Sequence, residues 1–147
     1  MQQQKQYKVL LIGETCEDSY IFGSVDRISP EAPVPVLLHE ETVTALGMSE
    51  NVKRNLQSFG VHVTHITNKN LIKKKRVVHS SSKQQLVRID ENDQVDPIKP
   101  AEVKMAFLTA EFDAIVISDY DKGFVTIEDL MTFCQNFPGP VFIDTKK

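Results

Sequence analysis

The sequence predicts an α/β fold, in which helices flank a parallel sheet and a smaller β-sheet projects from this core. Short apolar runs alternate with segments of helical periodicity, which is the pattern of βαβ units. Two stretches, 20–39 and 75–90, are extended and do not follow that alternation. The 147 residues suffice for one domain with a hydrophobic core but not for two.

Four segments have the length and apolar character of core strands. The segment 61–66 alternates apolar and polar residues with the period of a strand, and 114–118 is a run of the kind that is buried on both faces. The four expected strands are 7–12, 61–66, 114–118 and 141–144.

Three helices are expected between these strands. In 48–59 apolar residues recur at helical spacing, and Gly60 is a C-terminal cap. Pro100 begins the second helix, because proline is tolerated in a first turn. Thr126 caps the third, with Asp129 in the acidic position of a capping box. The expected buried faces are Val52, Leu56 and Phe59, then Val103, Phe107 and Leu108, then Ile127, Leu130, Met131 and Cys134.

The two extended stretches predict a small sheet outside the core. The first contains Pro30, Pro33 and Pro35, which exclude a helix, and its apolar residues alternate. The second reads as two strands joined by a polar turn at 80–82. Prolines in such a sheet indicate edge positions.

Composition and charge exclude several classes of protein. The net charge of −3 provides no general attraction for nucleic acid or an anionic membrane. No apolar run approaches the roughly 20 residues of a membrane span. The polar N-terminus does not resemble a signal peptide. Cys16 and Cys134 lack a CxxC partner, so we expect reduced thiols in a cytoplasmic protein.

Polar residues follow three of the expected core strands, at 13–18, 118–123 and 144–147. Ligands of open parallel sheets bind beyond the carboxyl ends of the strands. Carboxylates accept hydrogen bonds from sugar hydroxyls, and lysines attract phosphate, so the three segments are typical of a site for a phosphorylated sugar. The alternative is that polar residues merely end the strands. Three converging segments favour a site.

The basic run 69–76 (KNLIKKKR) and the four histidines allow simpler interpretations. No aromatic residue interleaves the run, so a solvated entrance to a strand is favoured over a nucleic-acid patch. The histidines have no metal-ligand spacing, and we expect them to be structural, with no metal site. They are His39, His62, His65 and His79.

The segment 13–18 and the run 27–36 (RISPEAPVPV) resemble the N-terminal half of the heptose-phosphate kinases, which belong to the ribokinase (PfkB-type) group of carbohydrate kinases. Further similar segments follow in order along nearly the whole chain. They are 47–55, 74–76, 84–90, 118–123 and 142–144. The resemblance implies a Rossmann-like core with a β-sheet lid, and a homodimer in which two lids clasp.

The resemblance also implies a set of substrate-binding residues. Asp18 matches the aspartate that holds sugar hydroxyls, and Asn51 matches an asparagine that faces the sugar. Their alternatives are a loop cap for Asp18 and a helix N-cap for Asn51. Lys74 or Arg76 would contact the substrate phosphate. The full expected set is Asp18, Gly47, Asn51, Lys74, Arg76, Asp119 and Lys122.

Several positions depart from the family pattern. Met48 stands where the family has the second of two glycines, and Ser49 and Glu50 replace two alanines. Asp121 replaces a small residue, and the segment between Ile66 and Lys74 is short, as if a strand and a helix were missing. Met48 and Glu50 are expected to narrow or recharge the pocket.

The Gly-Ala-Gly-Asp motif, which carries the family's catalytic base and anion hole, is absent. Asp144 is no substitute, because no glycine-rich turn follows it. ATP and magnesium are implied by the resemblance only, and no catalytic residue is assigned.

These observations predict one partial, truncated domain over 1–147. Its core comprises 7–18, 47–68 and 99–147, and its lid 19–46 and 72–92. The expected function is the sugar-phosphate-binding half of a carbohydrate kinase without turnover of its own. The alternatives are a non-catalytic sugar-binding or dimerisation module and a fragment of a full-length kinase.

Overall fold

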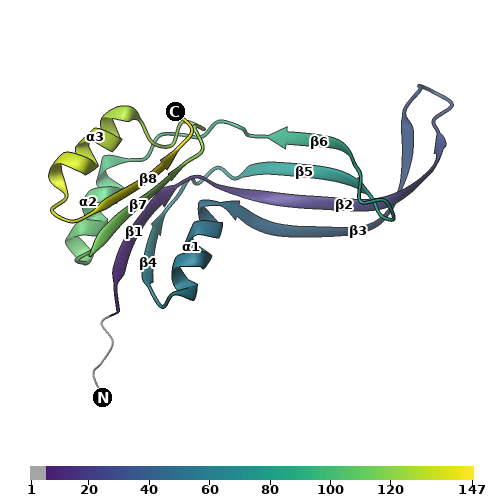
Figure 1. Ribbon diagram of the computed structural model, residues 1–147. Coiled ribbons are helices and arrows are strands. Elements are labelled where there is room, and N and C mark those ends of the chain that lie inside the picture. The colour runs from purple at the N-terminus through teal and green to yellow at the C-terminus, as the bar shows by residue number, and fades with distance from the viewer. Residues whose placement is uncertain (1–5) are drawn as a thin grey trace, which may run out of the picture.

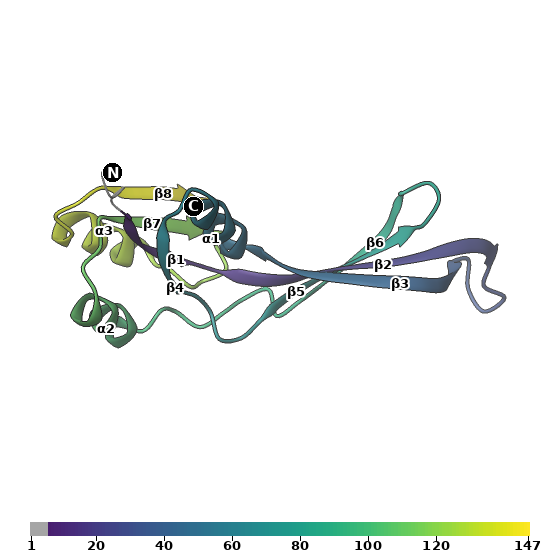
Figure 2. The same cartoon turned by 90° about the horizontal axis from the view of Figure 1, so that it is seen from below.

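Two four-stranded sheets form the structure, which is a computed structural model describing residues 6–147 (Figure 1). The expectation of a polar N-terminus without a signal peptide concerns mainly residues 1–5, which lie outside the described part. One sheet forms a core with the helices, and the other extends from it as a long arm, the lid (Figure 2).

The core sheet is parallel and has the order β4-β1-β7-β8. The four strands expected from the sequence are confirmed, each within about two residues at its ends. Their bounds are β1 Lys8–Gly13, β4 His62–Ile66, β7 Ala114–Asp119 and β8 Val141–Thr145. Continuous apolar runs in β1 and β7 fit their central positions, because such strands are covered on both faces.

The helices are α1 (Ser49–Ser58), α2 (Pro100–Thr109) and α3 (Ile127–Asn136). Helices α2 and α3 cover one face of the core sheet, and α1 lies on the other (Figure 1). Every second side chain of the central strands faces α2 and α3, and these residues form one hydrophobic core with the two helices. Its members include Leu10, Ile12, Ile115 and Ile117 with Ala106 and Phe133.

The lid sheet has the order β3-β2-β5-β6, with β2 and β5 parallel and the other neighbours antiparallel. Its strands are β2 Thr15–Ile28, β3 Pro35–Met48, β5 Ile72–His79 and β6 Gln85–Glu91. The lid begins at Thr15 rather than at residue 19, and it includes Gly47 and Met48, which we expected in the core. The segment 13–18 therefore passes from one sheet into the other.

The prolines lie where a sheet tolerates them. Pro30 and Pro33 fall in the connection between β2 and β3, and Pro35 is the first residue of the edge strand β3. Because proline donates no hydrogen bond to a ladder, an edge or strand start is its expected place. The polar turn expected near 80–82 is confirmed, since β5 ends at His79 and β6 begins at Gln85.

Two expected helix ends are confirmed. Gly60 follows α1 with φ of +77°, a left-handed conformation that favours glycine. At α3 the backbone N–H of Asp129 donates to Oγ1 of Thr126 over 3.1 Å, and the backbone N–H of Thr126 donates to Oδ2 of Asp129 over 2.9 Å. This pair is a complete capping box.

The expected helix faces were partly wrong. Leu108 of α2 is 71% exposed, Ile127 and Met131 of α3 are 54% and 59% exposed, and Cys134 is exposed as well. The residues that are buried instead are Ala106 and Phe133. Apolar residues lie on several sides of α2 and α3, so periodicity alone did not determine which side meets the sheet. Phe59 is 84% exposed because α1 ends one residue before it.

Among residues 6–147, no helix is long and apolar enough to cross a membrane. Both cysteines are free, with Cys16 buried and Cys134 exposed.

Candidate functional site

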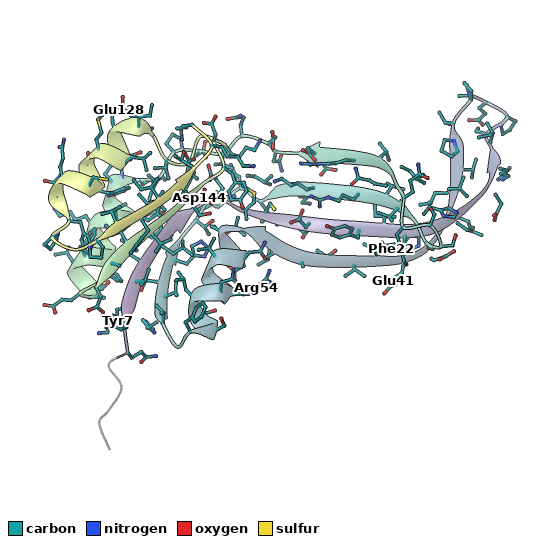
Figure 3. The ribbon with its side chains drawn as sticks, viewed as in Figure 1. Tyr7, Phe22, Glu41, Arg54, Glu128 and Asp144 are labelled. Atoms are coloured by element: carbon teal, nitrogen blue, oxygen red, sulfur yellow. The ribbon has the colours of Figure 1, made fainter. Side chains whose placement is uncertain are left out.

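The three polar segments expected at one edge do converge there. Gly13 is paired with Ser118, and Ser118 with Asp144, so the carboxyl ends of β1, β7 and β8 lie side by side. The lid strand β2 begins just beyond β1, which places the root of the lid at the same edge. Asp144 lies at this junction of core and lid (Figure 3).

Glu14 ties two of these segments together. Its side chain is fully buried and accepts from the backbone N–H of Tyr120 over 2.9 Å and that of Lys122 over 3.1 Å. A buried carboxylate with hydrogen bonds of this kind fixes a loop firmly. Sequence reasoning did not single out Glu14, because its partners lie more than a hundred residues away.

Three of the predicted residues meet on one face of the lid. Asp18 is paired with Lys74 and Tyr20 with Arg76 in the β2–β5 ladder, so the four side chains project on the same side. Nη1 of Arg76 donates to Oδ1 of Asp18 over 2.6 Å, and the guanidinium lies 5.1 Å from the centre of the Tyr20 ring. This Asp18–Arg76 pair is the centre of the candidate site.

Cys16 supports Asp18 from the neighbouring position on that face. Its thiol donates to Oδ2 of Asp18 over 3.5 Å. Burial, and next the negative charge of Asp18, raise the pKa of the Cys16 thiol to about 11. The thiol therefore stays protonated near neutral pH and remains a donor.

Gly47 is required by this arrangement. It is paired with Cys16, and a Cβ atom at this position would lie 2.2 Å from Oδ2 of Asp18 and 3.2 Å from Sγ of Cys16. The sequence predicted close approach of the Gly47 backbone to a ligand. Within the protein itself, the close approach is to the Asp18 carboxylate.

Asp119 and Lys122 are held by other residues of the protein. The Asp119 carboxylate is buried and accepts from Oγ1 of Thr145 over 2.6 Å and Nζ of Lys147 over 2.7 Å. Burial raises its pKa, but the bonds from Lys147 and Thr145 outweigh this and hold the pKa below its usual range. Nζ of Lys122 pairs with Asp93 over 2.7 Å. Both residues lie at the edge of the site, and each is already paired with an oppositely charged residue of the protein.

Asn51 lies in the exposed first turn of α1. Its side-chain oxygen accepts from Arg54, which also donates to the Leu46 carbonyl over 2.7 Å. Asn51 is not the helix N-cap that we considered, because Met48 holds that position. Its side chain therefore belongs to a hydrogen-bonded group on α1 and β3, separate from the Asp18–Arg76 pair.

The residues that depart from the family pattern form a group of their own. Oγ of Ser49 lies 2.9 Å from Nε2 of His65, and Nδ1 of His65 lies 3.4 Å from Oε2 of Glu50. Ser49 also donates to the Gly13 carbonyl over 3.1 Å. Burial lowers the pKa of His65, and the charge of Glu50 opposes this only in part. His65 thus has the structural role expected of the histidines, through partners that the sequence did not reveal.

Only part of the basic run 69–76 lies on the lid face that carries Asp18. Lys69 pairs with Glu102 over 2.8 Å and Lys75 with Glu91 over 2.5 Å, which fits the solvated strand entrance expected for the run. Lys74 and Arg76 lie on the face that carries Asp18.

Comparisons with known proteins show what the chain is similar to. The chain is 32% identical to the bifunctional protein HldE of Nitratiruptor sp., over an alignment covering 95% of the chain and 36% of that protein. It is 31% identical to the D-β-D-heptose 7-phosphate kinase of Bordetella bronchiseptica, covering 95% of the chain and 54% of that enzyme. No family model matches the chain.

Solved structures share the fold at low sequence identity. A carbohydrate kinase from Agrobacterium tumefaciens superimposes with a TM-score of 0.57 at 12% identity, over 94% of the chain and 53% of that structure. Phosphofructokinase-2 from Escherichia coli, in complex with fructose-6-phosphate, gives 0.57 at 16% identity, over 97% of the chain and 55% of that structure.

The fold is therefore that of the ribokinase-like carbohydrate kinases. Within that class, the chain is a homologue of the D-β-D-heptose 7-phosphate kinases and the bifunctional HldE proteins along nearly its whole length. It spans about half the length of the first of these and about a third of the second.

Proposed function

We propose that this chain binds a sugar phosphate where the lid meets the carboxyl ends of β1, β7 and β8, as the acceptor-side part of a kinase for heptose 7-phosphate or a similar sugar. The observation that carries the proposal is the Asp18–Arg76 pair, with Lys74 beside it on the same lid face.

The chemistry of this face suits such a ligand. The Asp18 carboxylate has two oxygens that can accept from neighbouring hydroxyls, while the Arg76 and Lys74 cations attract phosphate. The relatives and structural neighbours support the same proposal, because they include a heptose 7-phosphate kinase and a phosphofructokinase in complex with fructose-6-phosphate.

Catalysis requires more than this face offers. The glycines are Gly13, Gly23, Gly47, Gly60, Gly123 and Gly139, and none stands in a phosphate-binding or Gly-Ala-Gly-Asp pattern. Residues 6–147 contain no group of three or more His, Cys, Asp or Glu side chains that could hold a metal ion. The described residues include no motif that would hold ATP, and we derive no phosphoryl-transfer step through ATP or magnesium.

We therefore propose that the 147-residue chain alone has no measurable kinase turnover. The alternatives remain a non-catalytic binding module and a piece of a longer kinase. The intact mass of the natively expressed protein separates these two. We also propose a cytoplasmic location. The two free cysteines support it, because thiols stay reduced in that compartment.

Binding is tested by titrating the chain calorimetrically with a panel of sugar phosphates and the corresponding free sugars. We expect sugar phosphates to bind and Asp18→Ala to weaken binding about tenfold or more, because a charge-assisted hydrogen-bond acceptor is lost. Asp26→Ala is the matched control, since Asp26 lies exposed on the same strand. Wild-type protein that binds no sugar phosphate would contradict the proposal.

Turnover is tested separately with ATP, magnesium and the same panel. Product formed by the wild type and lost in Asp18→Ala would overturn the expectation that the chain alone is inactive.

We also propose self-association through the lid. Its strands and connections expose large apolar side chains that a second copy could cover. They are Ile28, Val34, Leu38, Val43, Leu46, Val87 and Ile89. Light scattering should give a dimer that Leu38→Lys disrupts, whereas Phe59→Lys, an exposed position outside the lid, leaves it intact. A strict monomer at high concentration would rule this out.

A further inference from the structure

Two lysines at the junction of core and lid lack the carboxylate partner that their neighbours have. Arg76, Lys122, Lys147 and Arg88 pair with Asp18, Asp93, Asp119 and Asp90 respectively. In the described part of the chain, Lys74 of β5 and Lys146, which follows β8, have no carboxylate oxygen within 4.0 Å of their ammonium groups.

Both lysines instead converge on Tyr120. Nζ of Lys146 lies 4.6 Å and Nζ of Lys74 lies 5.8 Å from the centre of its ring. Nζ of Lys74 donates to the sulfur of Met48 over 3.5 Å. An aromatic face and a thioether are weak partners, so both ammonium groups retain donors for a stronger one.

The position of Tyr120 is fixed from the core side. Its backbone N–H donates to the buried Glu14 carboxylate, and its ring lies near the ammonium groups of Lys74 from the lid and Lys146 from the core. Two cations held near one ring repel each other. An anion that contacts both would replace that repulsion with two charge-assisted interactions.

The nearby carboxylates of the protein do not act as the anion that binds both lysines. Asp18, Asp90 and Glu14 are engaged by Arg76, Arg88 and the 120–122 backbone. Burial raises the pKa of the Tyr120 hydroxyl, and Asp144 is the charge that raises it most. Asp144 is exposed, and among residues 6–147 no cation lies within 4.0 Å of its carboxylate, so its charge opposes an incoming anion.

We propose that Lys74 and Lys146, positioned on Tyr120, form a phosphate-binding site that bridges the lid and the core. A phosphate dianion has enough oxygens to accept from both ammonium groups at once, whereas a single carboxylate is smaller and carries half the charge. The identification of the anion as the phosphate of a bound sugar rests on the proposed function. The site itself should also bind inorganic phosphate.

Titration calorimetry of the full chain with inorganic phosphate, at constant ionic strength, tests the site. Lys74→Gln and Lys146→Gln should each weaken binding about tenfold, and the double variant should abolish it. Asp144→Asn should strengthen binding. Lys104→Gln on α2 is the control, because that lysine is exposed and distant in the fold.

The melting temperature should change little in Lys146→Gln, since this side chain is exposed, so lost binding would not reflect unfolding. Wild-type protein that binds no phosphate at millimolar concentration, or variants that bind as the wild type does, would overturn the proposal.

Sugar phosphates separate this inference from the proposed function. Equal binding of a sugar phosphate by the wild type and the double variant would refute the lysine site and leave the proposed function intact. Lysine-dependent binding of inorganic phosphate, with no sugar phosphate binding more tightly, would establish the site and refute the proposed function.

Discussion

Arg76 donates to Asp18 over 2.6 Å across two neighbouring lid strands, 58 residues apart in the chain. Both side chains are only about a fifth to a quarter exposed, so the pair is neither a surface ion pair nor a fully buried one. Arg76 also covers the Tyr20 ring, and Asp18 accepts from the Cys16 thiol. The pair therefore joins the lid strands and keeps the carboxylate in place for a ligand.

Removing one partner should cost more than removing both. Arg76→Gln leaves the Asp18 charge partly buried and unpaired, and we expect a loss of about 1–2 kcal/mol in the free energy of unfolding. The double variant, which combines Asp18→Asn with Arg76→Gln, should recover part of that loss. Urea unfolding of the four proteins measures the coupling, and strict additivity would contradict it.

Two glycines should differ in how alanine affects ligand binding. Gly47→Ala places a methyl group against the Asp18 carboxylate and should weaken sugar-phosphate binding as well as stability. Gly60→Ala meets open space but keeps φ at +77°, so it should cost about 1 kcal/mol and leave binding unchanged. Calorimetry and urea unfolding test both, and unchanged binding in Gly47→Ala would count against the prediction.

Met48 adopts φ of +58° and ψ of −126° at the start of α1, a conformation that favours glycine. Met48→Gly and Met48→Ala both lose the buried side chain and should both be less stable than the wild type. The glycine variant should be the more stable of the two by about 1 kcal/mol, because it relieves the strain. The usual order, with alanine more stable, would show that the backbone is not strained here.

His65 should make stability depend on pH. Its folded-state pKa is lower than the ordinary 6.5, so the unfolded chain binds more protons between these two values. Its contribution is fully present above about pH 6.5 and is lost as the pH falls through the folded-state pKa. The charged groups that face it are Glu50 and Lys53.

The measurement is the melting temperature of the wild type and of His65→Gln across this pH range. The wild type should lose more stability on acidification than the variant. Parallel curves would mean that His65 titrates alike in the folded and unfolded states.

The order of strands and helices could be predicted from the sequence, because it depends on local properties. Apolar runs, proline positions and the Thr126 capping box act within a few residues, and the structure confirms each of them. The convergence of 13–18, 118–123 and 144–147 also followed from sequence, since parallel strands present their carboxyl ends at one edge.

The faces of α2 and α3 could not be predicted in this way. Both helices carry apolar residues on more than one side, and contact with the sheet selected Ala106 and Phe133 over Leu108 and Ile127. The start of the lid at Thr15 was equally hidden, because a strand that leaves one sheet for another has no local signal at the crossing point.

The sequence by itself determined the fold class, the elements and the set of residues from which a site could be built. Only the tertiary structure decided which of them meet: Asp18 with Arg76, Ser49 with His65, and Lys74 with Lys146 on Tyr120. Each of these contacts joins separate strands or segments. They depend on strand register and on the junction of two sheets, which are set by packing across the whole chain rather than by neighbouring residues.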